Sequence, residues 1–453
     1  NTSSDTYDGT PTLQNPFFQI SPVSESYLNY FNDINHESSF VKDYMKRINR
    51  YLVDEYHIDG FRFDLTKGMT NEIIAENYSN KRVNYLKSVA DDIWEYDSDS
   101  YIIFEHFQNS EESVFSDYGI MSWGEENYQY NEATMGYPSD FKGISYKARG
   151  FSNPTLVGFM ESHDKERLMY KNITYGNSDG EYDIKNFDIA LNRMKAAGAL
   201  FLTVPGPKMI WQFGELGFEK SINTCEDGTV SENCKLSRKK SAFELDMQND
   251  PTRVKLYNTW SRILNIRRSE SIFKTANFTT TFSSDLKYMI LNDDNSDNIK
   301  KIIIIANFGT QTKEVNGNIL PNGEWYDLFG NNSKINISDQ NKLSLNPAQF
   351  IMLGDKKSSV EDDENLLLSN EKLLNKKIKV YPNPSKENVY IEMDRSIELP
   401  LKASLFNSNG SLIWDMKIYD HFYLLNSKFL SSGVYNLILT NNDFYSSEKI
   451  IKK

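Results

Sequence analysis

Apolar and polar positions alternate between two periodicities along the first part of the chain. Over residues 38–56 the apolar residues recur at the three- and four-residue spacing of one helical face, and residues 58–65 then alternate as a strand. The same succession repeats downstream, with strands predicted at 101–105, 119–123, 156–161 and 208–213 and helices at 72–94, 186–202 and 251–268. Alternating strands and helices favour a parallel sheet with right-handed crossovers. The pattern therefore predicts an α/β fold with five strand–helix units.

A different pattern begins near residue 269. Short apolar runs punctuated by Asn, Gly and Asp continue from 272 to 353 and predict an all-β module, in which residues 302–306 form a buried strand. A charged stretch follows and predicts a linker with one helical turn at 366–368. Short strands then return. We therefore divide the chain into an irregular leader (1–35), the α/β region (36–268), a β-sandwich (269–355), the linker (356–375) and a second small β-sandwich (376–453).

The charge balance narrows the classes of partner. Lys and Arg number 50 against 63 Asp and Glu, for a net charge of −13. The chain lacks the basic excess that phosphate backbones require, so we predict no nucleic-acid partner. Its most apolar run, residues 302–306, is far shorter than the roughly 20 residues of a membrane-spanning helix. We therefore expect no transmembrane segment.

The chain has two cysteines, Cys225 and Cys234, in one polar loop. In an oxidising compartment a disulfide between them would stabilise the loop by about 2–3 kcal/mol, whereas in a reducing compartment they would stay thiols. Two cysteines alone do not supply the four-ligand pattern of a zinc site. The pairing therefore depends on where the protein resides.

Acidic residues end three of the predicted strands. Asp64, Glu105 and the segment 161–164, which ends in Asp164, follow strands whose carboxyl ends lie at one edge of a parallel sheet. A single Asp in such a position is usually a turn or helix-cap residue, but three acids at one edge predict a pocket. Arg62 shares a strand face with Asp64, and a cation so close favours an ionised carboxylate. A second acid with a raised pKa would complete the pair that cleaves a glycosidic bond.

Three segments resemble, in order, signature strands of glycoside hydrolase family 13, the alpha-amylase family: Asp59-Gly60-Phe61-Arg62-Phe63-Asp64, Phe104-Glu105-His106 and Phe159-Met160-Glu161-Ser162-His163-Asp164. The resemblance implies a (β/α)8 TIM barrel in which these segments are the fourth, fifth and seventh strands. Residues 205–215 resemble the eighth strand, and residues 272–353 resemble the β-sandwich, domain C, that follows the barrel. The expected fold is therefore a partial barrel, strands four to eight, followed by two β-sandwiches.

The resemblance further implies a retaining mechanism with three catalytic carboxylates. Asp64 would be the nucleophile, Glu105 the general acid/base, and Asp164 the residue that binds sugar hydroxyls and stabilises the transition state. Substrate-binding or orienting roles fall to three further residues: Arg62, Lys67 and His163. We expect the carboxyl groups of Asp64 and Glu105 to lie about 5–5.5 Å apart, the separation of retaining glycosidases.

Two departures from the family pattern affect these expectations. The Asp-rich first signature, which ends in Asn-His, is not found before residue 35. Barrel strands one to three are therefore expected to be missing, and because five strands cannot close an eight-stranded barrel, the chain is expected to be an inactive fragment of a longer protein. Lys67-Gly68 stands where many amylases carry Lys-His, whose His carbonyl helps to hold a structural calcium ion. Calcium is compatible with the family but no residue set supports it, and we expect no other metal or cofactor.

The last block of the chain carries its own motifs. Val380-Tyr381-Pro382-Asn383-Pro384 opens it, and Ser432-Gly433-Val434-Tyr435-Asn436-Leu437 lies near its end. The residues by themselves predict a small sandwich without an activity. The motifs resemble the type A sorting domain of the type IX secretion system of Bacteroidetes. That resemblance implies export to the cell surface or medium and a partner in the secretion machinery, and it favours the Cys225–Cys234 disulfide.

Three functions are compatible with these residues. The first is a secreted alpha-glucan hydrolase that cleaves alpha-1,4 bonds in starch, glycogen or maltooligosaccharides. The second is a pullulanase-like or transglycosylating enzyme with the same triad. The third, of another class, is a non-catalytic carbohydrate-binding surface protein on a decayed barrel. The joint presence of Asp64, Glu105 and Asp164 argues against decay.

Overall fold

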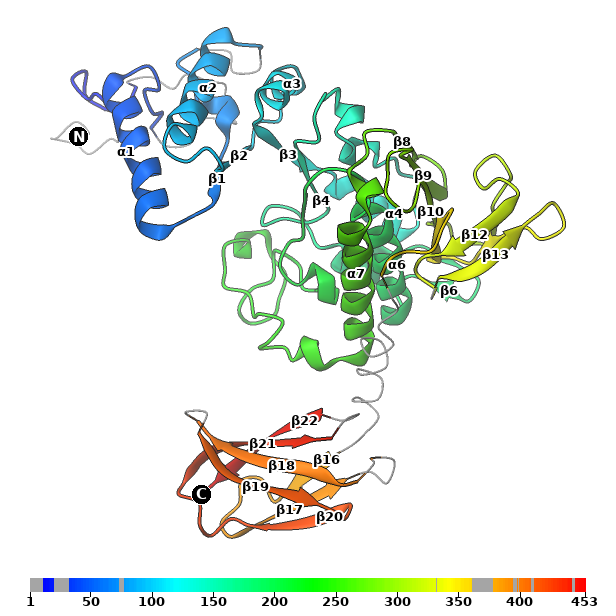
Figure 1. Cartoon of the computed structure of the whole chain (residues 1–453). Coiled ribbons are helices and arrows are strands. Elements are labelled where there is room, and N and C mark those ends of the chain that lie inside the picture. The colour runs from blue at the N-terminus through cyan, green and yellow to red at the C-terminus, as the bar shows by residue number, and fades with distance from the viewer. Residues whose placement is uncertain are drawn as a thin grey trace. The chain divides into compact units, whose positions relative to one another are not determined.

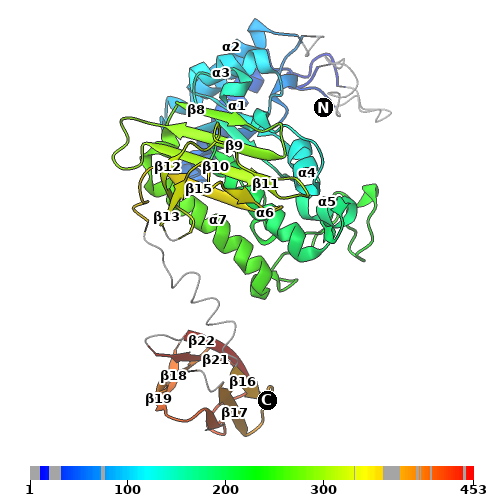
Figure 2. The same ribbon diagram turned by 90° about the vertical axis from the view of Figure 1, so that its right-hand side faces the viewer.

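The computed structural model describes residues 11–19, 32–72, 77–330, 332–360, 378–393, 397, 399–408, 411–441 and 445–453. They belong to two compact units, Asn1–Val360 and Glu361–Lys453, whose elements are drawn in Figures 1 and 2. The helical turn predicted at 366–368 lies outside the described residues, as does most of the predicted linker.

A five-stranded parallel sheet forms the middle of the first unit (Figure 1). Its strands lie in chain order, β1-β2-β3-β4-β7, and every neighbouring pair is parallel. The strands are β1 (Gly60–Phe63), β2 (Tyr101–Phe104), β3 (Met121–Glu125), β4 (Leu156–Phe159) and β7 (Lys208–Met209). The five predicted strands are confirmed, although β7 is much shorter than the predicted 208–213. Together they form a parallel half-barrel sheet.

Helices precede, connect and follow these strands: α1 (Ser39–Tyr56), α2 (Asn80–Trp94), α3 (Asn109–Tyr118), α4 (Asn127–Met135), α5 (Leu168–Tyr175), α6 (Phe187–Phe201) and, after β7, α7 (Pro251–Ser269). A short hairpin, β5 (Ser178–Asp179) and β6 (Tyr182–Asp183), joins α5 to α6. The helix predicted over 72–94 begins at Asn80, because the Ser79 side chain caps it by accepting the backbone N–H of Arg82. The start of α7 agrees with the prediction, since Asp250 caps it and Pro251 occupies its first position.

The two faces of β1 differ in the side chains that they present. Phe61 and Phe63 pack in a hydrophobic cluster with buried residues of α2. Arg62 points to the other face, where its guanidinium lies over the indole of Trp123 in β3. Gly60 allows β1 to approach β2 closely, because a Cβ there would lie 2.2 Å from the carbonyl oxygen of Tyr101. The strand therefore presents its arginine away from α2.

A six-stranded antiparallel sheet completes the first unit, with the order β13-β12-β15-β10-β9-β8 (Figure 2). Its strands are β8 (Phe278–Thr281), β9 (Leu286–Asn292), β10 (Lys301–Asn307), β12 (Gly323–Asp327), β13 (Ser333–Ile337) and β15 (Phe350–Gly354). A two-stranded sheet, β11 (Lys313–Glu314) and β14 (Ser344–Leu345), accompanies it. Helix α7 ends at Ser269, next to the predicted boundary at 268/269. The domain limits themselves stay predictions.

Strand β10 explains the unbroken apolar run at 302–306. Ile302 and Ile304 belong to the cluster that the sheet shares with α6 and α7. Ile303 and Ile305 belong to a second cluster on the other face of the sheet, together with Leu345 of β14. A strand buried on both faces has no polar side to expose. The predicted buried strand is therefore confirmed.

The second unit is built from two antiparallel sheets with the orders β16-β17-β20 and β19-β18-β21-β22. Its strands are β16 (Ile378–Tyr381), β17 (Asn388–Met393), β18 (Leu401–Asn407), β19 (Leu412–Ile418), β20 (Phe422–Asn426), β21 (Gly433–Thr440) and β22 (Tyr445–Lys452). Val389 and Ile391 of the first sheet share a hydrophobic core with Leu405 and Leu437 of the second. Across the described parts of both units, no helix is long and apolar enough to cross a membrane.

Candidate active site

Arg62 lies between two carboxylates at the carboxyl ends of adjacent strands. Its Nη1 is 2.6 Å from Oδ1 of Asp64, which follows β1, and its Nη2 is 3.0 Å from Oε1 of Glu105, which follows β2. The guanidinium carbon also lies 5.1 Å from the ring centroid of Trp123 in β3. Three neighbouring strands thus fix one arginine. The structure brings together three of the predicted site residues, Arg62, Asp64 and Glu105.

The turn after β1 holds Glu105 in place. Leu65 adopts the left-handed backbone conformation, with φ 42°, and donates its N–H to Oε2 of Glu105 over 3.1 Å. Thr66 donates its backbone N–H and its hydroxyl to the carbonyl oxygen of Glu105, at 2.9 and 3.0 Å. The position of Glu105 relative to Asp64 is therefore set by backbone as well as side-chain contacts.

The two carboxyl groups differ in environment. Burial raises the pKa of Glu105, and its hydrogen bond with the Asp64 carboxyl raises that pKa further, against the opposing effects of the Leu65 N–H and the Arg62 charge. The side chain of Glu105 is 11% exposed, whereas that of Asp64 is 68% exposed. A buried acid with a raised pKa thus lies beside an accessible carboxyl group contacted by Arg62. This is the division of environments that a proton donor and a nucleophile require.

A buried polar network behind Glu105 escaped the sequence analysis. His106 Nδ1 lies 2.9 Å from the hydroxyl oxygen of Thr66, and His106 Nε2 lies 2.8 Å from Oε2 of Glu111 in α3. Glu111 in turn accepts a 2.8 Å hydrogen bond from Nε of Arg82 in α2, and neither side chain of this ion pair is exposed. The network links both strand ends to the two helices that pack behind them.

Lys67 lies beside this network. Its carbonyl oxygen accepts a 3.0 Å hydrogen bond from Nη1 of Arg82. Burial and the Arg82 charge lower the pKa of the Lys67 amine, although the Glu111 charge raises it. The carbonyl of Gly68 accepts the N–H of Thr70 at 2.8 Å. Among the described residues, no group of three or more His, Cys, Asp or Glu side chains is arranged to hold a metal ion. We therefore derive no step through calcium.

Asp164 and His163 form a second cluster beyond β4. His163 Nε2 is 3.1 Å from Oδ2 of Asp164, and Nζ of Lys235 is 2.6 Å from Oδ1. Burial raises the pKa of Asp164, but the hydrogen bond from Lys235 and the charges of His163 and Lys165 outweigh burial, so that the pKa is lowered. The His163 ring lies 6.0 Å from that of Trp211, which follows β7. Asp164 is thus held ionised by cations on its own loop and on a distant one.

The two clusters lie at the same edge of the sheet because the strands that carry them are parallel. Between them, Lys165 Nζ pairs with Oε2 of Glu125 at the end of β3, over 2.9 Å. Within the described ranges, no hydrogen bond or ion pair joins Asp164 to Asp64 or to Glu105. The structure therefore assembles the predicted triad as a pair and a separate third acid.

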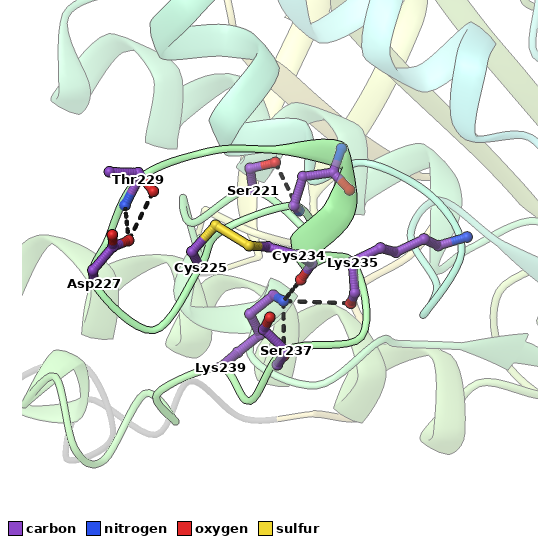
Figure 3. Close-up of a disulfide and its surroundings, with 9 residues drawn as sticks. Ser221, Cys225, Asp227, Thr229, Cys234, Lys235, Ser237 and Lys239 are labelled. Atoms are coloured by element: carbon purple, nitrogen blue, oxygen red, sulfur yellow. Dashed lines mark hydrogen bonds between the residues drawn. A yellow bond between two sulfur atoms is a disulfide. The ribbon is translucent and has the colours of Figure 1, made fainter.

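A loop closed by a disulfide borders the second cluster. Cys225 and Cys234 are bonded to each other (Figure 3). Beside this loop, a cavity of about 330 Å³ is lined by residues that include His163, Trp211 and Lys235. The cavity lining thus combines an aromatic ring with polar and charged side chains.

Comparison with known families and structures agrees with this geometry. Residues 23–266 match the family described as alpha amylase, catalytic domain, and residues 379–453 match the secretion system C-terminal sorting domain. A sequence search of curated proteins finds no match.

Several solved structures share the fold. The alpha-amylase from Geobacillus thermoleovorans, complexed with acarbose, is similar over 71% of this chain and 65% of its own, with a TM-score of 0.51 and 15% identity. An Anoxybacillus alpha-amylase is similar over 73% of this chain and 66% of its own, with a TM-score of 0.50 and 13% identity. Pullulanase type I from Bacillus subtilis, complexed with maltose, is similar over 73% of this chain and 48% of its own, with a TM-score of 0.54 and 17% identity. The chain thus spans less than two thirds of the length of each of these proteins.

The catalytic-domain match covers more than half of the chain, and it contains both strand ends that hold Arg62. The sorting-domain match covers the strands of the second unit and marks the chain for export. The chain therefore belongs to the alpha-amylase family, with an alpha-amylase catalytic domain followed by a secretion system sorting domain.

Proposed function

We propose that the protein is a retaining hydrolase of alpha-glucans. One observation supports this most directly: Arg62 contacts both Asp64 and Glu105 at the carboxyl ends of adjacent parallel strands, in a domain of the alpha-amylase family. Retaining cleavage needs a nucleophilic carboxylate and a proton donor next to the same glycosidic bond. The accessible Asp64 and the buried Glu105 meet that need.

In this mechanism Asp64 attacks the anomeric carbon while Glu105 gives its proton to the departing oxygen. The glycosidic bond breaks and a glycosyl ester forms on Asp64. Glu105, now a base, takes a proton from water, and the water oxygen displaces Asp64 with net retention of configuration. Asp164 and His163 bind sugar hydroxyls next to the cleaved bond, and Lys67 serves the leaving-group side. The expected separation of the Asp64 and Glu105 carboxyl groups is about 5–5.5 Å.

The half-barrel sheet also has a specific place in this proposal. We assign β1, β2, β3, β4 and β7 to strands four to eight of a (β/α)8 barrel, and the antiparallel sheets of the first unit to domain C. The assignment is supported by the chain order of the strands and by the position of the acids at their carboxyl ends. The domain limits 36–268 and 269–355 belong to the same proposal.

The proposed substrates are glucans with alpha-1,4 bonds, such as starch, glycogen and maltooligosaccharides. Pullulanase-like cleavage of alpha-1,6 bonds is the second candidate, because a pullulanase is among the similar structures. Incubation of the full-length protein with starch, pullulan and maltoheptaose separates them. We expect alpha-configured maltooligosaccharides from starch, observed by proton NMR before mutarotation, and intact pullulan. Debranching of pullulan would favour the second candidate, whereas binding without hydrolysis would show a carbohydrate-binding protein instead.

The sorting domain leads to a prediction about export. Deleting residues 378–453 should leave the enzyme in the periplasm of a host with a type IX secretion system, because the second unit is the part that the machinery is proposed to recognise. Immunoblotting of the periplasmic and external fractions for the protein measures this, because it detects active and inactive chains alike. The full chain with Asp64→Asn is the matched control, since it should be exported as efficiently as the natural protein. Secretion of the shortened chain at the normal level would refute the assignment.

A further inference from the structure

Asp164 has a partner from a loop distant in the sequence. Lys235 lies 71 positions away, and its Nζ donates a 2.6 Å hydrogen bond to Oδ1 of Asp164. The other carboxylate oxygen, Oδ2, faces His163 at 3.1 Å. The charged groups that act on Asp164 are therefore His163, Lys165 and Lys235, and of these Lys235 alone lies outside the segment that follows β4.

The loop that carries Lys235 is fastened to the Asp164 segment at its base as well. The hydroxyl of Ser221 and the N–H of Ile222 donate to the carboxylate of Glu166, over 2.6 and 3.0 Å. Glu166 follows Asp164 by two positions. The chain then runs outward and returns through the Cys225–Cys234 disulfide directly before Lys235. The disulfide thus closes the loop between its two attachments to the Asp164 segment.

The backbone around Lys235 is also fixed on its other side. Nζ of Lys239 donates to the carbonyl oxygens of Cys234, Lys235 and Ser237, at 2.6, 3.3 and 2.8 Å. Figure 3 shows these bonds gathered on one ammonium group, with the Lys235 side chain extending away from the disulfide. Because the backbone is already held, the Lys235 side chain loses less conformational entropy when it binds Asp164.

We propose that Lys235 is a positioning residue that keeps Asp164 oriented for the glycan, and that the Cys225–Cys234 disulfide holds Lys235 in place, so that activity depends on the redox state of this disulfide. The inference rests on the role proposed above for Asp164. Lys235 need not leave when substrate binds, because a carboxylate offers about four acceptor positions. Lys235 also lines the cavity that contains His163 and Trp211, so that it acts at the wall of the site.

Replacing Lys235 with Met in the full-length protein tests the first part. We expect kcat on maltoheptaose to fall about tenfold with a small change in KM. The acidic limb of the pH profile should move to higher pH, because the variant removes the hydrogen bond and the positive charge of Lys235, which lower the pKa of Asp164. Lys235→Arg should restore most of kcat. Arg238→Met is the matched control, since Arg238 lies on the same loop but pairs with Glu244, and it should behave like the natural protein.

A double-mutant cycle tests the second part. Cys225→Ser with Cys234→Ser should lower kcat to about the level of Lys235→Met, and should lower it no further when Lys235 is already Met. Dithiothreitol, which supplies two electrons and two protons and is itself oxidised to a cyclic disulfide, should reproduce this loss in the natural protein. Additive losses would overturn the link between disulfide and lysine.

The outcomes separate this inference from the proposed function. Natural kcat in Lys235→Met, together with an inactive Asp164→Asn, would overturn the positioning role and leave the proposed function standing. An active Asp164→Asn would overturn the role of Asp164 itself. A loss in Lys235→Met that Lys235→Arg fails to restore, accompanied by a lower melting temperature, would show a structural role and also overturn the inference.

Discussion

Replacing Asp64 with Asn should lower kcat/KM for glucan hydrolysis by about 10³-fold or more in the full-length protein. An amide is a far weaker nucleophile than a carboxylate, so the glycosyl ester would not form at a useful rate. The amide would also lack the negative charge of the Asp64 carboxylate, which Arg62 contacts at 2.6 Å. Because the Asp64 side chain is 68% exposed, the variant should fold normally. Release of reducing ends from soluble starch measures activity, and circular dichroism measures folding.

The same strand supplies a matched control for this experiment. Asp59 is exposed and lies at the opposite end of β1 from Asp64. Asp59→Asn removes an equal charge and should leave the rate of starch hydrolysis unchanged. If Asp64→Asn hydrolysed starch at the rate of the natural protein, the nucleophile would have to be another residue and the mechanism proposed here would be wrong.

The parts of the fold that were predicted correctly depend on local spacing. The strand and helix periods arise within short segments, so the order and direction of β1 to β4 could be anticipated from apolar positions. The contact between Arg62 and Asp64 was predictable for the same reason, since residues two apart on a strand share a face. The start of α2 was predicted less well, because a cap formed by Ser79 rather than apolar spacing decides it.

The contacts that escaped prediction join segments that only the folded chain brings together. Lys235 reaches Asp164 across 71 positions from a loop whose sequence gives no sign of the pairing. Arg82 and Glu111 are 29 positions apart and lie on different helices. A charged residue in a helical pattern is normally assigned to the exposed face of the helix. The sequence pattern would therefore place Arg82 and Glu111 at the surface, whereas both are fully buried. Both contacts help to hold the predicted catalytic acids in place, and neither adds a further catalytic acid to the site.

Replacing the buried Glu111 with Gln should destabilise the first unit by about 3–5 kcal/mol at neutral pH, the usual cost of breaking a buried ion pair from one side. The variant removes the carboxylate that Arg82 and His106 contact, and neither side chain of the Arg82–Glu111 pair is exposed. Since the network also reaches Thr66, which binds the carbonyl of Glu105, starch hydrolysis should fall as well. Calorimetric unfolding of the full-length protein measures the loss of stability.

The dependence of this loss on pH distinguishes an ion pair from simple packing. Burial raises the pKa of Glu111, but hydrogen bonds from His106, Arg82 and the Ser79 N–H outweigh burial and lower the pKa from 4.5 to about 2. A folded-state pKa below the unfolded one contributes stability that is fully present above about pH 4.5 and is lost as the pH falls toward 2. The stability difference between the natural protein and Glu111→Gln should therefore be largest at pH 7 and narrow by pH 3.

Asp117→Asn provides the control, because Asp117 is exposed on the same helix and its replacement removes the same charge from the surface. Its unfolding temperature should match that of the natural protein at both pH values. Two results would contradict the interpretation of the network. One is a Glu111→Gln variant as stable as the natural protein at pH 7, and the other is a stability difference that stays constant down to pH 3, since a constant difference would arise from packing rather than from the charge of Glu111.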